Sequence, residues 1–225
     1  MDVARVQSWF AHGQFKEADY VTPKLEFWPA ILDTLKGKDG LSILEIGSME
    51  GRSALFFLNY FPESRITCVD PFFKDRSEIF DRNLAPHASR LEKIRSYSFD
   101  ALRKLRAEKR EFDLIYIDGS HKRETVILDS TLCWPMLKVG GILIWDDYGY
   151  YKASEPPADR PKQAIDGFLV AFADEYEELY RYGQLIVRKT VECPRGNLSP
   201  RIAPKEKRKG LIPKLKRRLV RMLSD

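Results

Sequence analysis

Short apolar runs alternate with amphipathic helical stretches over most of this chain of 225 residues. The runs of strand length are LSILEIG, RITCVD, LEKIRS, FDLIYID and GGILIWDD. Among them lie GRSALFFLNYF, FDALRKLRAEKR and KRETVILDSTLCWPML, in which apolar residues recur at the spacing of a helix. Apolar strands separated by helices are typical of a parallel sheet that helices cover on both faces. The pattern therefore predicts a doubly wound α/β fold.

The two ends of this region follow other patterns. The segment VTPKLEFWPAILDTLKG predicts an amphipathic helix that ends at Gly37, so we expect residues 1–37 to form an N-terminal helical cap. Near the other end, a helix around KQAIDGFLVAFADE precedes YEELYRYGQLIVRKT, two β-type runs joined at Tyr182-Gly183. A parallel connection needs a longer crossover, so these runs predict a hairpin. We therefore expect residues 38–192 to form a mostly parallel, seven-stranded sheet with an antiparallel strand at its C-terminal end.

The charge of the chain is concentrated at its C-terminal end. The net charge is +5, but residues 201–225 hold ten Lys and Arg against two acids and so carry +8, which leaves −3 for the rest. Residues 193–225 are therefore a basic tail attached to a mildly acidic body. Within it, Leu215, Leu219 and Leu223 have helical spacing. The tail is either a solvated, disordered end or an amphipathic segment that contacts an anionic membrane.

Several classes of protein are disfavoured by the sequence. The first twenty residues are charged throughout, and no segment has the roughly 20 apolar residues that span a bilayer, so we expect a cytoplasmic protein, with membrane association at the inner face left open. Cys68, Cys133 and Cys193 lack the spacing of a disulfide framework or zinc site. A nucleic-acid-binding protein acting through its tail is an alternative. The acidic body and the absence of aromatic residues from the basic run make a nucleic-acid partner unattractive.

Glycine and acidic residues gather where the first two strands end. In open α/β sheets, ligands bind outside the carboxyl ends of the strands. Gly47 and Gly51 allow a tight turn there, and the helix that follows offers N–H groups to a polar ligand. Glu45 is a carboxylate in an apolar strand, which costs stability unless it is paired. Asp70 ends the second strand about 20 residues after the turn, where a nucleoside site needs a carboxylate for its ribose. A plain turn and a strand that simply ends in Asp are the alternatives.

Three more acids follow the fourth and fifth strands. Asp118 ends one, and Asp146 and Asp147 end the other. Neighbouring strands lie about 5 Å apart, so these carboxylates can meet at one edge of the sheet. Clustered carboxylates repel one another unless a proton or cation intervenes, and Mg²⁺ prefers oxygen ligands. In the alternative, Asp118 caps the next helix, His121 lies on the surface and Asp147 is a turn residue.

Five motifs in order carry a resemblance to a known family: LEIGSMEGRS, CVDPF, RSYSFDAL, FDLIYIDGSH and LKVGGILIWDD. Over about residues 40–190 the chain resembles class I S-adenosylmethionine-dependent methyltransferases of the type 24 group, and the related macrocin-type, metal-dependent sugar O-methyltransferases. This resemblance implies a Rossmann-like fold and S-adenosylmethionine as cofactor. The cofactor residues that it implies are Glu45, Gly47, Ser48 and Gly51 at the methionine part, Asp70 at the ribose, Ser98 beside the adenine, and Asp118. Alternatively, Ser98 is the N-cap of the next helix.

The resemblance also implies a metal site and a catalytic base. Asp118, Asp146 and Asp147 would hold Mg²⁺ or another divalent cation, and His121 would act with Asp118 in catalysis. A metal-bound hydroxyl loses its proton readily, an imidazole can accept that proton, and the oxygen can attack the sulfonium methyl. We therefore expect an O-methyltransferase that acts on a hydroxyl of a small-molecule or glycan acceptor. A metal-independent methyltransferase of the same fold is the alternative, and a homo-oligomer is left open.

Tyrosines crowd the segment after the fifth strand. Tyr148, Tyr150 and Tyr151 precede a proline-rich stretch and lie beside the proposed site. Loops at this edge often carry binding residues, so the tyrosines could form a lid over the acceptor. Ordinary packing of the loop is an equal alternative.

Overall fold

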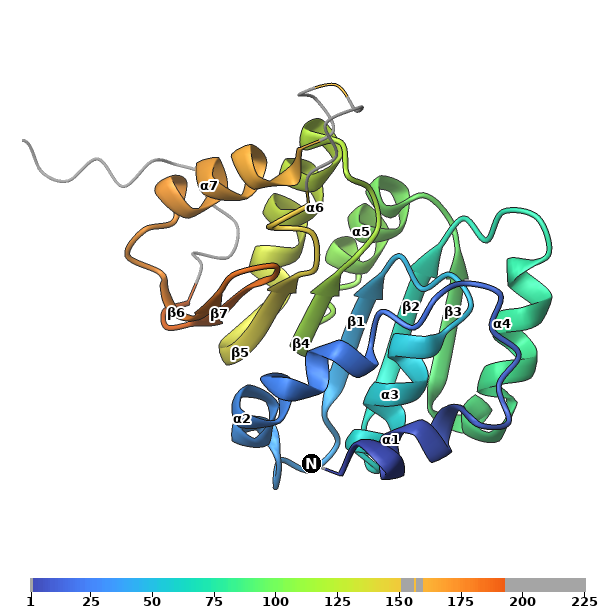
Figure 1. Cartoon of the computed structure of the whole chain (residues 1–225). Coiled ribbons are helices and arrows are strands. Elements are labelled where there is room, and N and C mark those ends of the chain that lie inside the picture. The colour runs from blue at the N-terminus through green and yellow to red at the C-terminus, as the bar shows by residue number, and fades with distance from the viewer. Residues whose placement is uncertain (1, 151–155, 157–159, 193–225) are drawn as a thin grey trace, which may run out of the picture. The chain divides into compact units, whose positions relative to one another are not determined.

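The structure of the protein is a computed structural model, which describes residues 2–150, 156 and 160–192. Within these residues seven strands form one sheet in the order β3-β2-β1-β4-β5-β7-β6 (Figure 1). The strands are β1 Ser42–Ile46, β2 Arg65–Asp70, β3 Leu91–Arg95, β4 Phe112–Ile117, β5 Leu137–Trp145, β6 Tyr176–Arg181 and β7 Leu185–Lys189. The order reverses between β1 and β4, which is the place where open α/β sheets bind ligands.

The directions of the strands confirm the predicted topology. Strands β1 to β5 pair in parallel, whereas β7 is antiparallel to both β5 and β6. The predicted hairpin joins β6 to β7, and Tyr182 N donates to Gln184 O at 2.9 Å across its turn. β7 is therefore the single strand, among those described, that opposes the direction of the others.

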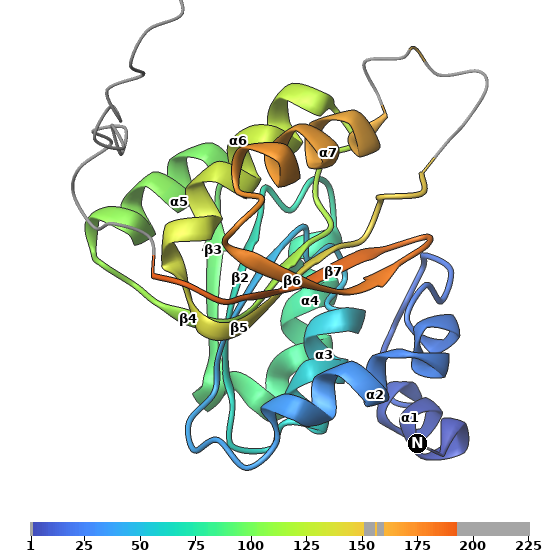
Figure 2. The same cartoon turned by 90° about the vertical axis from the view of Figure 1, so that its left-hand side faces the viewer.

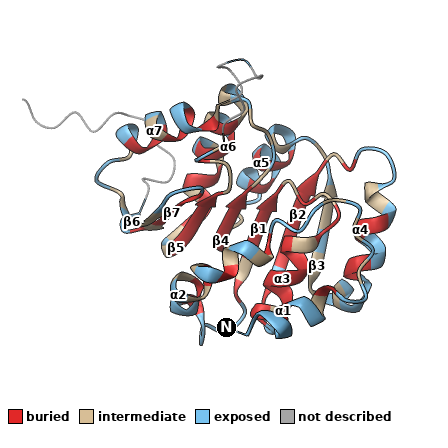
Figure 3. Ribbon diagram, viewed as in Figure 1, coloured by how far each residue is buried: buried red, intermediate tan, exposed pale blue. Residues whose placement is uncertain are grey.

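Helices cover both faces of the sheet (Figure 2). One face is covered by α1 Val3–Phe10, α2 Trp28–Leu32, α3 Arg52–Tyr60 and α4 Arg76–Leu84; the other by α5 Ser98–Ala107, α6 Arg123–Cys133 and α7 Pro161–Ala171. Each layer has its own apolar cluster against the strands. Buried residues fill the central strands, and exposed residues lie on the outer sides of the helices (Figure 3). Cys68 and Cys133 are fully buried, as expected of small core residues, and Cys193 lies outside the described residues.

The helix predicted to end at Gly37 is broken into three pieces. They are the 3₁₀ helix η1 Thr22–Glu26, then α2, then the 3₁₀ helix η2 Asp33–Leu35. Pro23 and Pro29 each lack an N–H, so a continuous ladder of helical hydrogen bonds cannot run through the segment. The prediction of one continuous helix was wrong for this reason. Trp28, at the start of α2, is fully buried in the same cluster as β1 and β4.

The sequence left other local features unpredicted. Neither α4 nor the 3₁₀ helix η3 Ala85–Arg90, which together connect β2 to β3, was predicted. The apolar stripe of α4 is short, with Ile79, Phe80 and Leu84 buried. The predicted interruption near Pro135 is the 3₁₀ helix η4 Trp134–Met136. Strand β5 begins at Leu137, before the predicted Gly140, and its register against β4 shifts.

The predictions for the basic tail lie outside the described residues. The alternatives of a disordered end, a membrane contact and a nucleic-acid contact all concern residues 193–225, which are not described. Among the described helices, none combines the length and apolar character needed to cross a bilayer. The proposed boundaries at residues 37 and 192 stay predictions.

Candidate active site and metal centre

The turn after β1 is built around a glycine that no other residue can replace without distortion. Gly47 has φ +88°, and a Cβ placed on it would lie 1.9 Å from the carbonyl oxygen of Asp118. Its N–H donates to Val69 O at 2.9 Å, while Asp118 N donates to Ile46 O at 2.8 Å. The glycine therefore lets the ends of β1, β2 and β4 come together. Gly51 also has positive φ, +83°, and its missing Cβ would overlap Leu84.

Asp70 is tied to the same turn. One of its carboxylate oxygens accepts a hydrogen bond from Met49 N at 3.0 Å, and the other from Phe72 N at 2.5 Å. Met49 and Phe72 both have positive φ, 44° and 48°, which side-chain-bearing residues rarely adopt. The carboxylate thus holds two unusual backbone conformations in place. Each oxygen keeps acceptor capacity for a further donor such as a ribose hydroxyl.

Two buried polar atoms at this turn have no hydrogen-bond partner in the described part of the chain. They are Glu45 Oε1 and Ser48 Oγ. Glu45 is fully buried, its other oxygen lies 3.4 Å from Cys68 Sγ, and burial raises the pKa of its carboxyl group. Buried polar atoms without partners are rare, and each indicates a place for water, an ion or a ligand.

An open pocket adjoins this turn. Its walls come from residues 15–24 of the N-terminal segment and residues 47–53 after β1, together with Tyr116 and Asp118. The carboxylate of Glu50 accepts hydrogen bonds from the backbone N of Lys16 at 2.8 Å and of Glu17 at 3.2 Å. The N-terminal segment is therefore fastened beside the turn. Sequence analysis predicted neither this contact nor Glu50.

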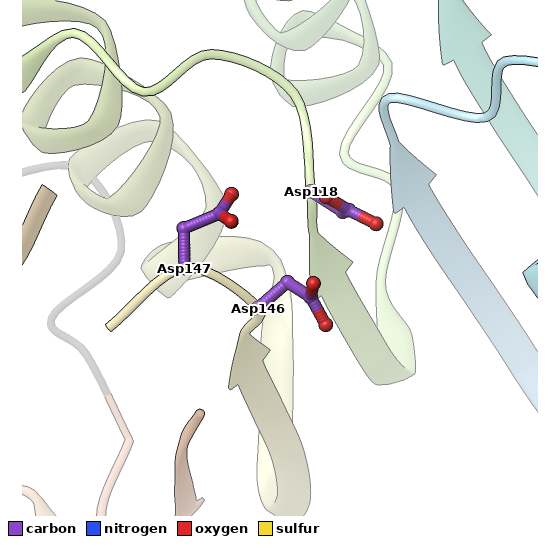
Figure 4. Close-up of side chains that lie close together, drawn as sticks. All are labelled: Asp118, Asp146 and Asp147. Carbon is purple, nitrogen blue, oxygen red and sulfur yellow. The ribbon is translucent and has the colours of Figure 1, made fainter. Parts of the chain in front are cut away.

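The structure brings the three predicted acids together. Asp118 follows β4, Asp146 and Asp147 follow β5, and one carboxylate oxygen from each lies within 4.8 Å of the others (Figure 4). Burial raises the pKa of Asp118 well above its usual value, and the charges of Asp146 and Asp147 raise it further, whereas Lys24 opposes them. These groups repel one another strongly and attract a cation.

Asp146 is held by three side chains that the sequence did not reveal. Its Oδ1 lies 2.5 Å from Lys24 Nζ, accepts a hydrogen bond from Tyr116 Oη at 2.6 Å and receives another from the Gln184 amide. Gln184 also accepts a hydrogen bond from Trp28 Nε1 at 2.7 Å. Tyr116 could have been suspected, since it lies two residues before Asp118 and so faces the same side of β4. Lys24 gave no such signal, because it comes from a segment 122 residues away that packing alone brings to Asp146.

His121 lies at the acid cluster, where it contacts Asp147 and not Asp118, the acid nearest to it in sequence. Its Nε2 lies 3.3 Å from Asp147 Oδ2, and its ring centroid lies 3.9 Å from that of Tyr150. The alternative in which Asp118 caps the next helix is wrong, because the N-cap of α6 is Lys122. Tyr151 and most of the expected lid lie outside the described residues.

Ser98 lies away from the acid cluster, at the start of α5. The structure places Tyr97 at the N-cap, one residue earlier than predicted, without a capping hydrogen bond from its side chain. Ser98 hydrogen bonds to Asp129, a buried carboxylate of α6 whose pKa burial raises to about 6. A role for Ser98 beside the adenine stays a prediction.

Comparison with known proteins matches one segment of the chain to a family model. Residues 44–148, which contain the glycine turn, Asp70 and all three acids, match the family model of a methyltransferase domain, the type 24 group. The match shows that residues 44–148 are similar to the methyltransferase domains of this family. A viral relative, an uncharacterized protein of Acanthamoeba polyphaga mimivirus, is 29% identical over 123 residues, which are 52% of this chain and 56% of the viral protein.

Solved methyltransferase structures share the fold. MycE from the mycinamycin biosynthetic pathway has a TM-score of 0.63 and 16% identity over 88% of this chain and 57% of its own. An O-methyltransferase from Bacillus cereus has a TM-score of 0.58 and 19% identity over 83% and 89% of the two chains. The chain therefore spans little more than half the length of MycE and of the viral protein.

The residues present fit both groups that the resemblance implies, S-adenosylmethionine and a divalent ion. The unpartnered Glu45 Oε1 and Ser48 Oγ, with the open pocket beside them, suit a polar cofactor at the glycine turn. The donor set of Asp118, Asp146 and Asp147 consists of oxygens alone, which suits a hard divalent ion. The ammonium of Lys24 within the acid cluster indicates where a cation is favoured.

Proposed function

We propose that the protein transfers the methyl group of S-adenosylmethionine to a hydroxyl of a small-molecule or glycan acceptor, with the help of a divalent cation such as Mg²⁺. One observation carries the proposal. The backbone carbonyl of Asp118 packs against Gly47 of the glycine turn, and the carboxylate of the same residue belongs to the acid cluster. A cofactor at the turn and a hydroxyl at the cluster would therefore meet at one residue.

The side chains have distinct roles in this reaction. When bound, S-adenosylmethionine supplies a methyl group on a sulfonium, and the divalent ion acts as a Lewis acid that lowers the pKa of the acceptor hydroxyl. Glu45, Ser48 and Asp70 would bind and orient the cofactor. Asp118, Asp146 and Asp147 would hold the ion. His121 would take the hydroxyl proton on a ring nitrogen, and the Asp147 carboxylate 3.3 Å away would stabilise the imidazolium.

The contents of the similar structures support this assignment. The MycE structure contains Mg, S-adenosylhomocysteine and mycinamycin VI, and the Bacillus cereus O-methyltransferase structure contains S-adenosylhomocysteine. Their identity to this chain is low, so they support a cofactor class and a reaction class. A membrane-bound acceptor reached through the basic tail, and a homo-oligomeric form, remain predictions.

A metal-independent methyltransferase is a second candidate because Lys24 already supplies a positive charge to the cluster. Its ammonium lies 2.5 Å from Asp146. In that case His121 would still take the proton, Asp147 would still stabilise the imidazolium, and chelation would leave turnover unchanged. The two candidates share the cofactor site and differ only in their response to EDTA.

The test is calorimetric titration with S-adenosylhomocysteine, with Mg²⁺ or EDTA, on wild type and Asp70→Ala. We expect micromolar binding that weakens at least about tenfold in the variant, as loss of a charged hydrogen-bonding group does. Asp39→Ala is the matched control, since Asp39 is exposed and precedes β1 at the opposite edge of the sheet. Failure of the folded wild type to bind would refute the proposed function. Binding would justify an acceptor screen among sugars and phenols, with and without EDTA.

A further inference from the structure

A lysine of the N-terminal segment occupies the acid cluster. Lys24 Nζ lies 2.5 Å from Asp146 Oδ1 and 2.9 Å from Tyr116 Oη. The two ion-paired side chains are only 12% and 14% exposed. This pair is therefore much better shielded from solvent and salt than an ion pair on the surface.

The surroundings of Lys24 favour its ammonium at this position. Its Nζ lies 5.5 Å from the ring centroid of Trp28, within the range of cation–π attraction. Trp28 is also linked to Asp146 through Gln184. The N-terminal segment thus reaches Asp146 by two routes, of which the ion pair is the direct one.

The same carboxylate belongs to the oxygen set that fits a divalent ion. Such an ion binds its oxygen ligands at about 2.0–2.6 Å. An ammonium 2.5 Å from Asp146 Oδ1 would then lie within a few ångströms of a doubly charged cation, and their repulsion in a half-buried site is large. Both cations cannot hold Asp146 at once without a heavy penalty.

We propose that Lys24 and the divalent ion compete for Asp146, so that Lys24 sets the affinity of the acid cluster for metal. Metal binding displaces the ammonium, and the open pocket that Lys24 lines gives its flexible side chain a place to go. Displacement removes the direct contact between Asp146 and the N-terminal segment. The inference rests on the proposed metal-assisted function and adds a residue outside the three acids.

The first test is calorimetric titration with Mn²⁺ alone, on wild type, Lys24→Gln and Lys24→Arg. Lys24→Gln removes the competing charge, so we expect its Kd for Mn²⁺ to fall at least about tenfold. Lys24→Arg keeps the charge and should bind like wild type. Lys36→Gln is the matched control, because Lys36 also pairs with an acid, Asp33, and lies 4.3 Å from a ring centroid, that of Tyr60, in the same segment.

The second test follows the N-terminal segment directly. Hydrogen exchange of the backbone amides in residues 15–28 of the wild type should accelerate when Mn²⁺ is added, because the segment loses its ion pair. In Lys24→Gln the exchange should be fast already and should not respond to Mn²⁺. Unchanged exchange in wild type at saturating Mn²⁺ would overturn the displacement.

The outcomes separate this inference from the proposed function. Equal Kd values for wild type and Lys24→Gln would overturn the competition and leave metal-assisted transfer intact. Weaker binding by Lys24→Gln would overturn it too, since Lys24 would then support the site. No Mn²⁺ binding by any of the proteins would remove both the metal part of the function and the inference, while titration with S-adenosylhomocysteine decides the cofactor part independently.

Discussion

The acids at the carboxyl ends of β1 and β2 and those at the carboxyl ends of β4 and β5 have different hydrogen-bond and ion-pair partners. Above β1 and β2, Asp70 accepts hydrogen bonds from the backbone N of Met49 and of Phe72. Above β4 and β5, Asp146 and Asp147 are contacted by side chains of distant segments, among them Lys24 and His121. The backbone donors are fixed once the chain has folded, whereas the side chains can leave.

This difference in donors indicates a difference in function. A carboxylate held by backbone N–H groups loses no partner to side-chain motion, so the glycine-turn side is preorganised for a cofactor of constant shape. Carboxylates contacted by the side chains of Lys24 or His121 can exchange these partners for a metal ion and an acceptor. The comparison predicts that substitutions on the glycine-turn side mainly reduce stability, and that those at the acid cluster mainly reduce function.

The largest loss of stability should follow Gly47→Ala. The new Cβ would lie 1.9 Å from Asp118 O in a backbone conformation with φ +88°, so β1 and β4 must separate. Steric overlap and strain together should lower the free energy of unfolding by at least about 3 kcal/mol and abolish cofactor binding. Urea denaturation and titration with S-adenosylhomocysteine measure the two effects.

Gly140→Ala is the control for this variant. Gly140 has a similar φ of +76°, but its missing Cβ has no neighbour within 4 Å. It should therefore lose only about 1 kcal/mol from strain and keep its cofactor affinity. Equal losses in the two variants would show that the close approach of β4 to the turn is unimportant.

A buried carboxylate that no backbone N–H stabilises should destabilise the fold when it ionises, in contrast to Asp70. The variant Asp129→Asn tests this. Asp129 has one carboxylate oxygen without a partner, and burial raises its pKa to about 6 from 3.8. The folded state therefore holds this proton more tightly than the unfolded state. Wild type should lose about 3 kcal/mol relative to Asp129→Asn as the pH rises from about 4 to about 6, and no more above it.

The measurement is the free energy of unfolding by urea at several pH values between 4 and 8, for both proteins. The difference between wild type and Asp129→Asn should grow only between about pH 4 and 6. A difference that is constant with pH would mean that Asp129 titrates normally in the fold. A buried carboxylate without backbone donors would then be as stable as one that has them, and the contrast with Asp70 would fail.

The fold was largely predictable because its signals are local. Apolar runs such as FDLIYID carry the length and composition of buried parallel strands, and the short Tyr182-Gly183 connection forces a hairpin. The N-terminal helices were not predictable in detail. There Pro23 and Pro29 break the helix, and burial of Trp28 against the sheet decides where the pieces lie.

The candidate site divides in the same way. The proximity of Asp118, Asp146 and Asp147 could be predicted from the sequence, because the ends of neighbouring parallel strands lie side by side. Lys24 and Gln184 could not, because they reach Asp146 from segments 122 and 38 residues away, and packing alone brings them there. Site residues at the strand ends can be predicted from the topology of the sheet. Site residues from other segments can be identified only in the tertiary structure.

A moderate loss should follow Asp70→Asn. The amide keeps one acceptor oxygen and turns an NH₂ group toward either Met49 N or Phe72 N, so one backbone donor is left without its partner. We expect a loss of about 1–3 kcal/mol in the free energy of unfolding, and weaker binding of S-adenosylhomocysteine. A variant as stable as wild type would remove the contrast between the two groups of acids.

The smallest effect on stability, and of opposite sign, should follow Asp118→Asn. Burial and the charges of Asp146 and Asp147 raise the pKa of Asp118, so the metal-free wild type loses stability as the pH rises above the ordinary range of an aspartate. The amide cannot ionise, keeps an oxygen for Tyr116, and should raise the free energy of unfolding at pH 7 without metal. Its affinity for Mn²⁺ should also fall. Mutation of residues that orient metal ligands typically costs roughly 10–100-fold in affinity, and loss of a ligand should cost at least as much. Denaturation in EDTA and calorimetry with Mn²⁺ give the two values, and a variant less stable than wild type in EDTA would show that Asp118 is needed for folding, as Asp70 is.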